Sequence, residues 1–256
     1  MPTNKSLGQH WLHDRSALEA IVNEAALQPG DTALEIGPGL GTLTSELLRR
    51  QAKVISVEYD AELARKLPGQ FPGKDLTVVH QDILQFDITK LPAGYTVVAN
   101  VPYYITSKII EKFLRTTNKP RRMVLLVQKE VAQRLAAGPG DMSLLALSAQ
   151  LFTRVHVGAM VPRALFTPPP KVDSQVVVLD FLSTPLIDQV DEKAFWHVAH
   201  AGFSERRKKL RSSIAAGLRV SKPEAEALLR HADINPNARA EDLSIADWQR
   251  LAKDAV

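Results

Sequence analysis

Short hydrophobic runs alternate with longer segments of helical periodicity over the first two thirds of the sequence. The short runs are bounded by turn formers, as is typical of buried strands. They predict strands at 32–36, 53–57, 76–80, 96–99, 123–127, 155–160 and 176–181. Apolar residues three and four positions apart predict helices at 17–26, 43–50, 61–67, 105–114, 130–137 and 144–152. This alternation predicts an α/β fold whose mostly parallel sheet has helices on both faces.

The pattern changes after Leu182, where a polar connector begins. Beyond it the composition is helical, and two polar starts indicate helices at Ser221-Lys-Pro-Glu224 and Ser244-Ile-Ala-Asp247. The sequence therefore predicts two domains, an α/β domain over 1–183 and a small all-helical domain over 184–256.

Composition narrows the classes of protein that remain. The chain has 256 residues, 45% of them hydrophobic and 23% charged, so it has enough apolar residues for a sizeable core. No run approaches the length of a membrane span, and the first residues lack the apolar stretch of a signal peptide. The absence of cysteine excludes disulfides and thiolate metal sites and fits the cytoplasm. A net charge of +4 permits a polyanionic partner without identifying one.

A glycine-rich turn follows the first predicted strand, in LEIGPGLGTLTSELL. Gly37, Gly39 and Gly41 allow the backbone to approach a ligand, and the following helix offers free N–H groups. Glu58 ends the next strand, at a distance that suits a carboxylate binding ribose hydroxyls. Alone, this pattern leaves a nicotinamide-dependent dehydrogenase open. However, the spacing GxGxG differs from GxGxxG, and Glu35 before the glycines favours a cationic ligand over a pyrophosphate.

The third predicted strand also ends in an acid, because Asp82 follows it directly and is itself followed by Ile83. Asp82 is placed to accept from an adenine amino group while Ile83 covers the ring. An isolated acid at such a position often only caps the next segment. Acids at the ends of three successive strands favour a ligand site, because ligands of α/β sheets bind at those ends. Together with the next motif they predict binding of S-adenosylmethionine.

The fourth predicted strand ends in Asn100-Val101-Pro102-Tyr103. An adenine amino group is a poor nucleophile, since its lone pair is delocalised into the ring. Two acceptors, the Asn100 side chain and the main-chain carbonyl of Val101 or Pro102, would favour the pyramidal form that attacks a methyl group. Tyr103 is placed to stack on the base, an interaction worth about 1–3 kcal/mol. A base inside a duplex cannot reach such a pocket, so the target must be flipped out or unpaired.

These blocks, in this order, resemble the KsgA/RsmA family of ribosomal RNA adenine dimethyltransferases over almost the whole chain. The matching stretches are Leu7-Gly-Gln-His-Trp-Leu12, Glu35-Ile-Gly-Pro-Gly-Leu-Gly-Thr-Leu-Thr44, Gln81-Asp82, Asn100-Val-Pro-Tyr-Tyr-Ile-Thr106, Gln128-Lys-Glu-Val131, Phe166-Thr-Pro-Pro-Pro-Lys-Val-Asp-Ser174 and Arg239-Ala-Glu-Asp-Leu-Ser-Ile245. Trp11 and Val101 depart from the family's usual Phe and Leu. The resemblance implies a Rossmann-like class I methyltransferase domain followed by a helical domain.

The resemblance also implies roles for particular residues. S-adenosylmethionine would be contacted by His10, Leu12, Gly37, Glu58, Asp82 and Asn100. Asn100, Pro102 and Tyr103 would be catalytic, and Tyr103 and Phe166 would sandwich the target base. The implied reaction gives N6,N6-dimethyladenosine at two adjacent positions in the 3′-terminal hairpin loop of small-subunit (16S) ribosomal RNA. The substrate would be the immature small ribosomal subunit, late in assembly.

A basic run in the C-terminal domain is the strongest candidate for RNA phosphate contact. Its cations are Arg206, Arg207, Lys208, Lys209 and Arg211. A solvated helix face is the default for such a run, and the context of an RNA enzyme favours phosphate binding. Lys119-Pro-Arg-Arg122 is a second candidate. The histidine pairs at 10 and 13 and at 197 and 200 lack an obvious third ligand, so no metal is expected.

Two other functions stay open. The first is an Erm-type enzyme that methylates one adenosine of large-subunit ribosomal RNA, which the Asn-Val-Pro-Tyr motif and the glycine loop do not separate from a small-subunit enzyme. Arg239-Ala-Glu-Asp-Leu243 and the PPPKVDS block favour the small-subunit enzyme. The second is a ribosome-assembly or transcription factor that has lost catalysis, against which the intact Glu58, Asp82, Asn100 and Tyr103 argue. A monomer is the default expectation.

Overall fold

The computed structural model describes residues 10–205 and 207–254, apart from the side chains of Tyr103 and Gln189. The chain divides into two compact units. One contains the residues up to Gln133 and Arg154–Phe181, and the other contains Arg134–Thr153 and the residues from Leu182 onward. The sequence assigns residues 134–153 to the first domain, whereas in the structure they pack with the helical unit.

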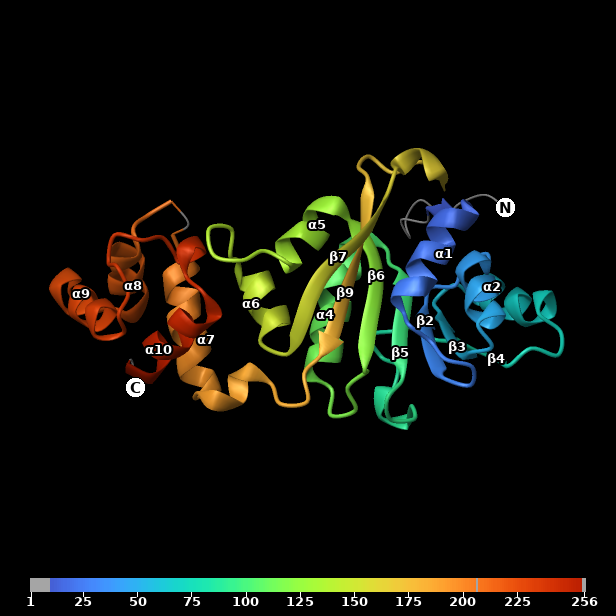
Figure 1. The fold of residues 1–256 in the computed structure, drawn as a ribbon, viewed down its shortest axis with the longest axis horizontal. Coiled ribbons are helices and arrows are strands. Elements are labelled where there is room, and N and C mark those ends of the chain that lie inside the picture. The colour runs from blue at the N-terminus through green and yellow to red at the C-terminus, as the bar shows by residue number, and fades with distance from the viewer. Residues whose placement is uncertain (1–9, 206, 255–256) are drawn as a thin grey trace. The chain divides into compact units, whose positions relative to one another are not determined.

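The first unit is built on a seven-stranded sheet with the strand order β4-β3-β2-β5-β6-β9-β7 (Figure 1). The strands are β2 (Thr32–Ile36), β3 (Lys53–Glu58), β4 (Leu76–His80), β5 (Thr96–Asn100), β6 (Arg122–Gln128), β7 (Thr153–Val161) and β9 (Ser174–Phe181). The strands β2 to β6 run parallel to one another, and β9 is antiparallel to β6. The order reverses between β2 and β5, and ligands of such sheets bind at the carboxyl ends of the strands beside that reversal.

Successive residues of the central strands point to opposite faces of this sheet, and apolar side chains are buried on both faces. The helices α1 (Arg15–Glu24) and α2 (Thr42–Arg49) pack on one face against side chains such as Val98 and Val124. The intervening residues of the central strands are fully buried as well, so the opposite face is also covered. The remaining helices that begin in this unit are α3 (Ala61–Lys66), η2 (Leu67–Gln70), η3 (Ile88–Lys90), η4 (Tyr103–Ile105), α4 (Thr106–Arg115), α5 (Lys129–Leu135) and η5 (Arg163–Leu165).

The start of α1 differs from the sequence pattern. Ser16 and Glu19 predict a capping box, but the N-cap is Asp14, whose side chain accepts a hydrogen bond from Ala17 N–H at 2.8 Å. The Ser16 hydroxyl also donates to that carboxylate, at 2.6 Å. An acidic cap satisfies a free helical N–H and interacts favourably with the helix dipole, so the earlier aspartate starts the helix two residues sooner.

A short two-stranded sheet joins the beginning of the described chain to a distant segment. In it, β1 (Trp11–Leu12) is antiparallel to β8 (Phe166–Thr167), with Leu12 opposite Phe166. The His10 ring extends this link, because its Nδ1 lies 2.7 Å from the main-chain oxygen of Pro168. A carbonyl oxygen only accepts hydrogen bonds, so Nδ1 carries the proton. The segment before α1 is thus fixed on both its backbone and its side chain.

The second unit is helical, as the sequence predicts. Its helices are α6 (Leu144–Gln150), η6 (Leu186–Gln189), α7 (Glu192–Phe203), α8 (Leu210–Leu218), α9 (Lys222–His231), η7 (Ala240–Asp242) and α10 (Ile245–Asp254). Its core includes Phe195 and Trp248, both fully buried. The helix start predicted at Ser221 is confirmed, and it forms a capping box in which Ser221 and Glu224 exchange side-chain and backbone hydrogen bonds. Among the helices of the described residues, none has the length and apolar character needed to cross a membrane.

Candidate cofactor and methyl-transfer site

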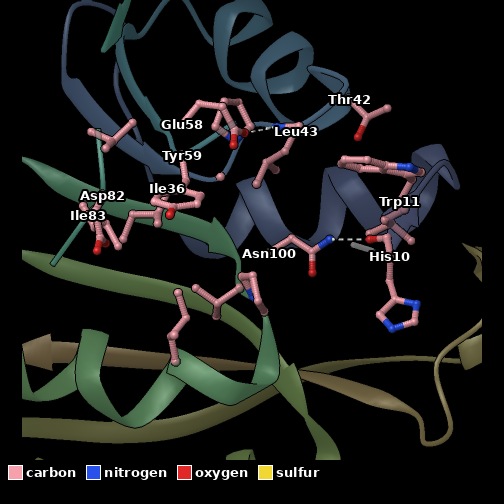
Figure 2. Close-up of a pocket in the computed structure, with 18 of the residues that line it drawn as sticks. His10, Trp11, Ile36, Thr42, Leu43, Glu58, Tyr59, Asp82, Ile83 and Asn100 are labelled. Carbon is pink, nitrogen blue, oxygen red and sulfur yellow. Dashed lines mark hydrogen bonds between the residues drawn. The ribbon is translucent and has the colours of Figure 1, made fainter. Parts of the chain in front are cut away.

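A cavity of about 340 Å³ lies at the carboxyl ends of β2, β3 and β5, beside the reversal of strand order (Figure 2). The six residues for which the family resemblance implies cofactor contacts all line it. They are His10, Leu12, Gly37, Glu58, Asp82 and Asn100. They come from β1 and the residue before it, from the ends of β3 and β5, and from the turns after β2 and β4, so the fold brings together residues up to ninety positions apart.

The glycine turn between β2 and α2 approaches the cavity through two left-handed residues. Gly37 has φ +66°, and a Cβ added there would meet no protein atom within 4 Å. Gly39 has φ +56°, and a Cβ there would overlap the six-membered ring of Trp11. Gly39 therefore lets β1 pack against the turn, whereas Gly37 keeps open space where it lines the cavity.

Glu58 lies at the end of β3 and is 6% exposed. Its Oε2 accepts from Gly39 N–H at 3.1 Å, and its Oε1 accepts from Asp60 N–H at 2.9 Å. Burial raises the pKa of this carboxyl, and the two N–H donors partly offset that effect. Each oxygen retains acceptor capacity beyond these bonds, so the oriented carboxylate is able to bind the hydroxyls of a ribose.

Asp82 and Ile83 form another side of the cavity, after β4. Asp82 Oδ1 accepts from Leu84 N–H at 2.9 Å, which fixes the carboxylate in the turn. Ile83 is 5% exposed and presents an apolar surface beside it. An oriented acceptor next to an apolar side chain suits the edge and face of an adenine ring.

Asn100 ends β5 and connects this strand to the segment before α1. Its Nδ2 donates to the main-chain oxygen of His10 at 3.3 Å, and Figure 2 shows its Oδ1 pointing away from that bond. Pro102 O accepts from Ile105 N–H at 3.2 Å and from the Thr106 hydroxyl at 3.4 Å. Because Pro102 O is engaged in starting η4 and α4, the Val101 carbonyl is favoured as the second acceptor for an amino group.

Glu35 has a different position from the other strand-end acids. It is fully buried, and its Oε2 accepts from the hydroxyls of Thr44 and Ser56, both at 2.7 Å. Ser56 lies opposite Glu35 in the β2–β3 register, and Thr44 belongs to α2. Glu35 therefore holds the helix that follows the glycine turn against the sheet. Its Oε1 is buried and has no hydrogen-bond partner among the described residues.

This arrangement predicts a pH dependence of stability. Burial raises the pKa of Glu35 from 4.5 to about 7, although the Ser56 and Thr44 hydroxyls act in the opposite direction. The folded state then binds a proton that the unfolded state loses near its ordinary pKa. Stability from this group is full below pH 4.5 and is lost as the pH rises toward 7. We expect Glu35→Gln to flatten the fall in the free energy of unfolding across this window.

Denaturant unfolding at pH 5, 6, 7 and 8 measures this effect. Glu62→Gln is the matched control, because it removes a carboxylate that is 61% exposed. Glu58 is also buried and its pKa is also raised, so it makes the free energy of unfolding fall with rising pH in both variants. A Glu35→Gln protein with the same pH profile as the control would contradict the assignment.

Of the two predicted base-stacking residues, Phe166 is not among those that line the cavity. Phe166 is 3% exposed and packs in the core beneath β1, so its position does not support stacking on a base. The side chain of Tyr103 lies outside the described part of the chain, and so does Arg206. Arg211 donates to Glu226 at 2.8 Å, so it is engaged within the helical unit.

The second basic candidate, Lys119-Pro-Arg-Arg122, has structural partners. Lys119 Nζ donates to Leu114 O at 2.6 Å, at the end of α4. Arg121 lies 3.3 Å from Asp31, and Arg122 lies 2.5 Å from Asp180. These side chains stabilise the amino-terminal edge of the sheet, opposite to the cavity, and their pairing argues against phosphate binding.

Two exposed aromatic residues at the cavity were given no role by the sequence. Tyr59 is 63% exposed and Tyr104 is 62% exposed, and both line the cavity. Each directly follows a residue at a predicted strand end or turn, which is the only sequence signal that marks them.

A metal site is not seen in the described structure. Within residues 10–205 and 207–254, no three acidic or histidine side chains are grouped so as to hold a metal ion.

The chemistry of the cavity fits S-adenosylmethionine. Oriented carboxylates suit its ribose hydroxyls and adenine amino group, and the open space beside Gly37 leaves room for a ligand against the glycine turn. The apolar surface of Ile83 suits the adenine ring.

Comparison with known proteins gives a consistent result. The family described as "Ribosomal RNA adenine dimethylase" matches residues 2–255. "Ribosomal RNA small subunit methyltransferase A" of Dehalococcoides mccartyi (strain CBDB1) is 43% identical over 255 residues, covering 98% of this chain and 88% of that protein. The protein of the same name from Geobacillus thermodenitrificans is 39% identical over 261 residues, covering 97% and 89%.

Solved structures support the same fold. The 23S rRNA methyltransferase ErmE aligns with a TM-score of 0.77 and 28% identity, covering 96% of this chain and 99% of that one. A dimethyladenosine transferase from Plasmodium falciparum aligns with a TM-score of 0.80 and 27% identity, covering 94% and 96%. The predicted class I methyltransferase fold and the predicted family are confirmed, as is the assignment as an S-adenosylmethionine-dependent rRNA methyltransferase. This chain belongs to the ribosomal RNA adenine dimethylase family.

Proposed function

We propose that this protein methylates the exocyclic N6 of two adjacent adenosines in the 3′-terminal hairpin loop of small-subunit ribosomal RNA, giving N6,N6-dimethyladenosine late in ribosome assembly. One observation carries the proposal. Asn100 and the turn after it open onto the same cavity as Gly37, Glu58 and Asp82, in a chain of this family. An acceptor site for an amino group and a nucleoside-binding site are thereby adjacent.

Six cavity residues would hold S-adenosylmethionine. Glu58 would accept from the ribose hydroxyls and Asp82 from the adenine amino group, with the glycine turn at Gly37 close to the ligand. His10 and Leu12 would cover the other side, held in place by the β1–β8 pairing. The bound cofactor supplies an electrophilic methyl group on its sulfonium.

The chain's own contribution to the reaction is to orient and polarise the target amino group. Asn100 Oδ1 and the Val101 carbonyl would accept its two hydrogens, which favours a pyramidal nitrogen with its lone pair directed at the methyl group. Pro102 would fix the turn that presents these acceptors, since its carbonyl begins η4. Tyr103 would stack on the flipped-out or unpaired base. No strong general base is required, because the proton leaves after attack.

The helical unit would contribute contacts to RNA phosphates. Arg207, Lys208 and Lys209 are exposed at the start of α8. Lys209 also donates to Asn237 Oδ1 at 3.1 Å, which leaves it two further N–H donors. The ion pair of Arg211 with Glu226 makes it a weaker candidate than these three cations. Arg206, the remaining cation of the basic run, lies outside the described residues. We further propose that the protein acts in the cytoplasm as a monomer on immature small subunits.

A second candidate is methylation of large-subunit RNA, because the chain aligns with 23S rRNA methyltransferase ErmE over 96% of its length. Incubating immature small subunits and large subunits separately with the protein and methyl-labelled S-adenosylmethionine distinguishes the two. We expect label in small-subunit RNA only. Label in large-subunit RNA alone would favour the second candidate. Binding to either particle without label would favour a factor that has lost catalysis.

A further inference from the structure

A second groove, of about 490 Å³, lies in the same unit as the cofactor cavity. Lys129, Arg163 and Lys171 bring three cations to it. Lys129 follows the last residue of β6, the strand that runs parallel to β5 and its terminal Asn100. The groove is therefore at the same edge of the sheet as the methyl-transfer site, one strand further along.

The other two cations flank β8, which pairs with the cavity-lining strand β1. Asp173 holds the three segments together. Its Oδ1 accepts from Arg163 N–H at 2.9 Å, and its main-chain oxygen accepts from Lys129 N–H at 3.0 Å. The Arg163 guanidinium also donates to Lys171 O, at 3.2 Å. These bonds give the groove a fixed backbone.

The charges in this groove differ from those at the opposite edge of the sheet. Across the described residues, Lys129, Arg163 and Lys171 have no carboxylate within ion-pair distance, although Glu130 and Asp173 also line the groove. At the amino-terminal edge, by contrast, Arg121 and Arg122 are both paired. Arg163 uses one guanidinium N–H for Lys171 O and has four left. The three cations are available to an external anion.

We propose that this groove binds backbone phosphates of the RNA strand that continues from the target adenosine. The inference rests on the proposed function, which requires a base to enter the cavity while its strand passes along this edge of the sheet. Phosphate contacts of this kind fix the register of a nucleic acid without reading its sequence. The groove thus positions the strand so that the base reaches Asn100.

The triple variant Lys129→Gln, Arg163→Gln and Lys171→Gln tests the proposal. Its matched control is the triple variant Lys53→Gln, Arg65→Gln and Lys74→Gln. This variant removes the same number of positive charges from exposed positions of the same unit. The readout is the affinity for a fluorescently labelled RNA hairpin across a salt titration. We expect the groove variant to bind at least about tenfold more weakly, with the salt slope reduced by roughly 0.7 per lost contact. The control should match the wild-type protein.

Two further measurements make the result specific. The affinity for S-adenosylmethionine should be unchanged in the groove variant, and its KM for RNA should rise while kcat is retained at saturating RNA. The double variant Lys129→Gln and Lys171→Gln covers the case in which loss of Arg163 disturbs the loop, because neither ammonium group makes a hydrogen bond within the described chain.

Wild-type RNA affinity in both groove variants, or an equal loss in the control, would overturn the proposal. Neither outcome depends on methyl transfer. Absence of methylation by the wild-type protein would instead count against the proposed function.

Discussion

Replacing Asn100 with alanine is expected to lower kcat by about 100- to 1,000-fold, the usual effect of removing one preorganised hydrogen-bonding group from an active site. The affinity for S-adenosylmethionine should stay within a few-fold of the wild-type value. The Asn100 Nδ2 bond to His10 O orients the amide so that Oδ1 faces away from it. The alanine variant loses the acceptor that would polarise the target amino group, whereas Glu58, Asp82 and the glycine turn remain.

The measurement is single-turnover methylation of an RNA hairpin, together with calorimetric titration of the cofactor. Asn100 has two roles, and the two readouts separate them. If its main role were to hold His10, cofactor affinity would fall with little change in the rate at saturation. Asn23→Ala, at an exposed position in α1, is the matched control. Near-normal turnover of the Asn100 variant would overturn its role in the reaction.

Replacing Gly39 with alanine is expected to disrupt the cover of the cavity. The new Cβ would overlap the ring of Trp11, and φ +56° is unfavourable for a residue with a side chain. The clash should destabilise the protein by about 1–3 kcal/mol, in addition to about 1–2 kcal/mol for the left-handed backbone. Displacement of β1 should also weaken cofactor binding at least about tenfold, a difference of about 1.4 kcal/mol.

Two other glycines provide controls for this variant. Gly94→Ala has φ +77° and no protein atom within 4 Å of the new Cβ, so it carries the backbone cost alone. Gly37→Ala should resemble it in stability but lose cofactor affinity, because its Cβ would extend into space at the cavity. Combining Trp11→Ala with Gly39→Ala should recover the stability lost to the clash. Equal stability of the Gly39 and Gly94 variants would show that Trp11 does not pack as described.

The sheet and the assembly of the cavity follow from local patterns. Buried parallel strands are continuous apolar runs, and their carboxyl ends must meet at one edge, so Glu58, Asp82 and Asn100 could be grouped from the sequence alone. The position of the Glu35 side chain could not be predicted in this way. A strand buried on both faces gives no signal that tells a carboxylate directed into the core from one directed into a cavity. Its partner Ser56 is set by the strand register, which the sequence does not specify.

Other differences have equally physical causes. The strands β1 and β8 have two residues each, too few to show any periodicity, and they pair across more than 150 positions. This pairing buries Phe166, for which the family resemblance implies a base-stacking role. Residues 134–153 pack with the helical unit although they lie between two strands of the sheet. Periodicity predicts the helices in that segment but not the core to which they contribute.

Mass spectrometry of nuclease-digested RNA tests the central claim most directly. Immature small subunits that lack the modification would be incubated with the protein and S-adenosylmethionine, and the digested fragments sequenced by their masses. We expect N6,N6-dimethyladenosine at two neighbouring positions of the 3′-terminal hairpin loop of the small-subunit RNA. Unmodified adenosines at both positions, in a preparation that binds the cofactor and the particle, would contradict it.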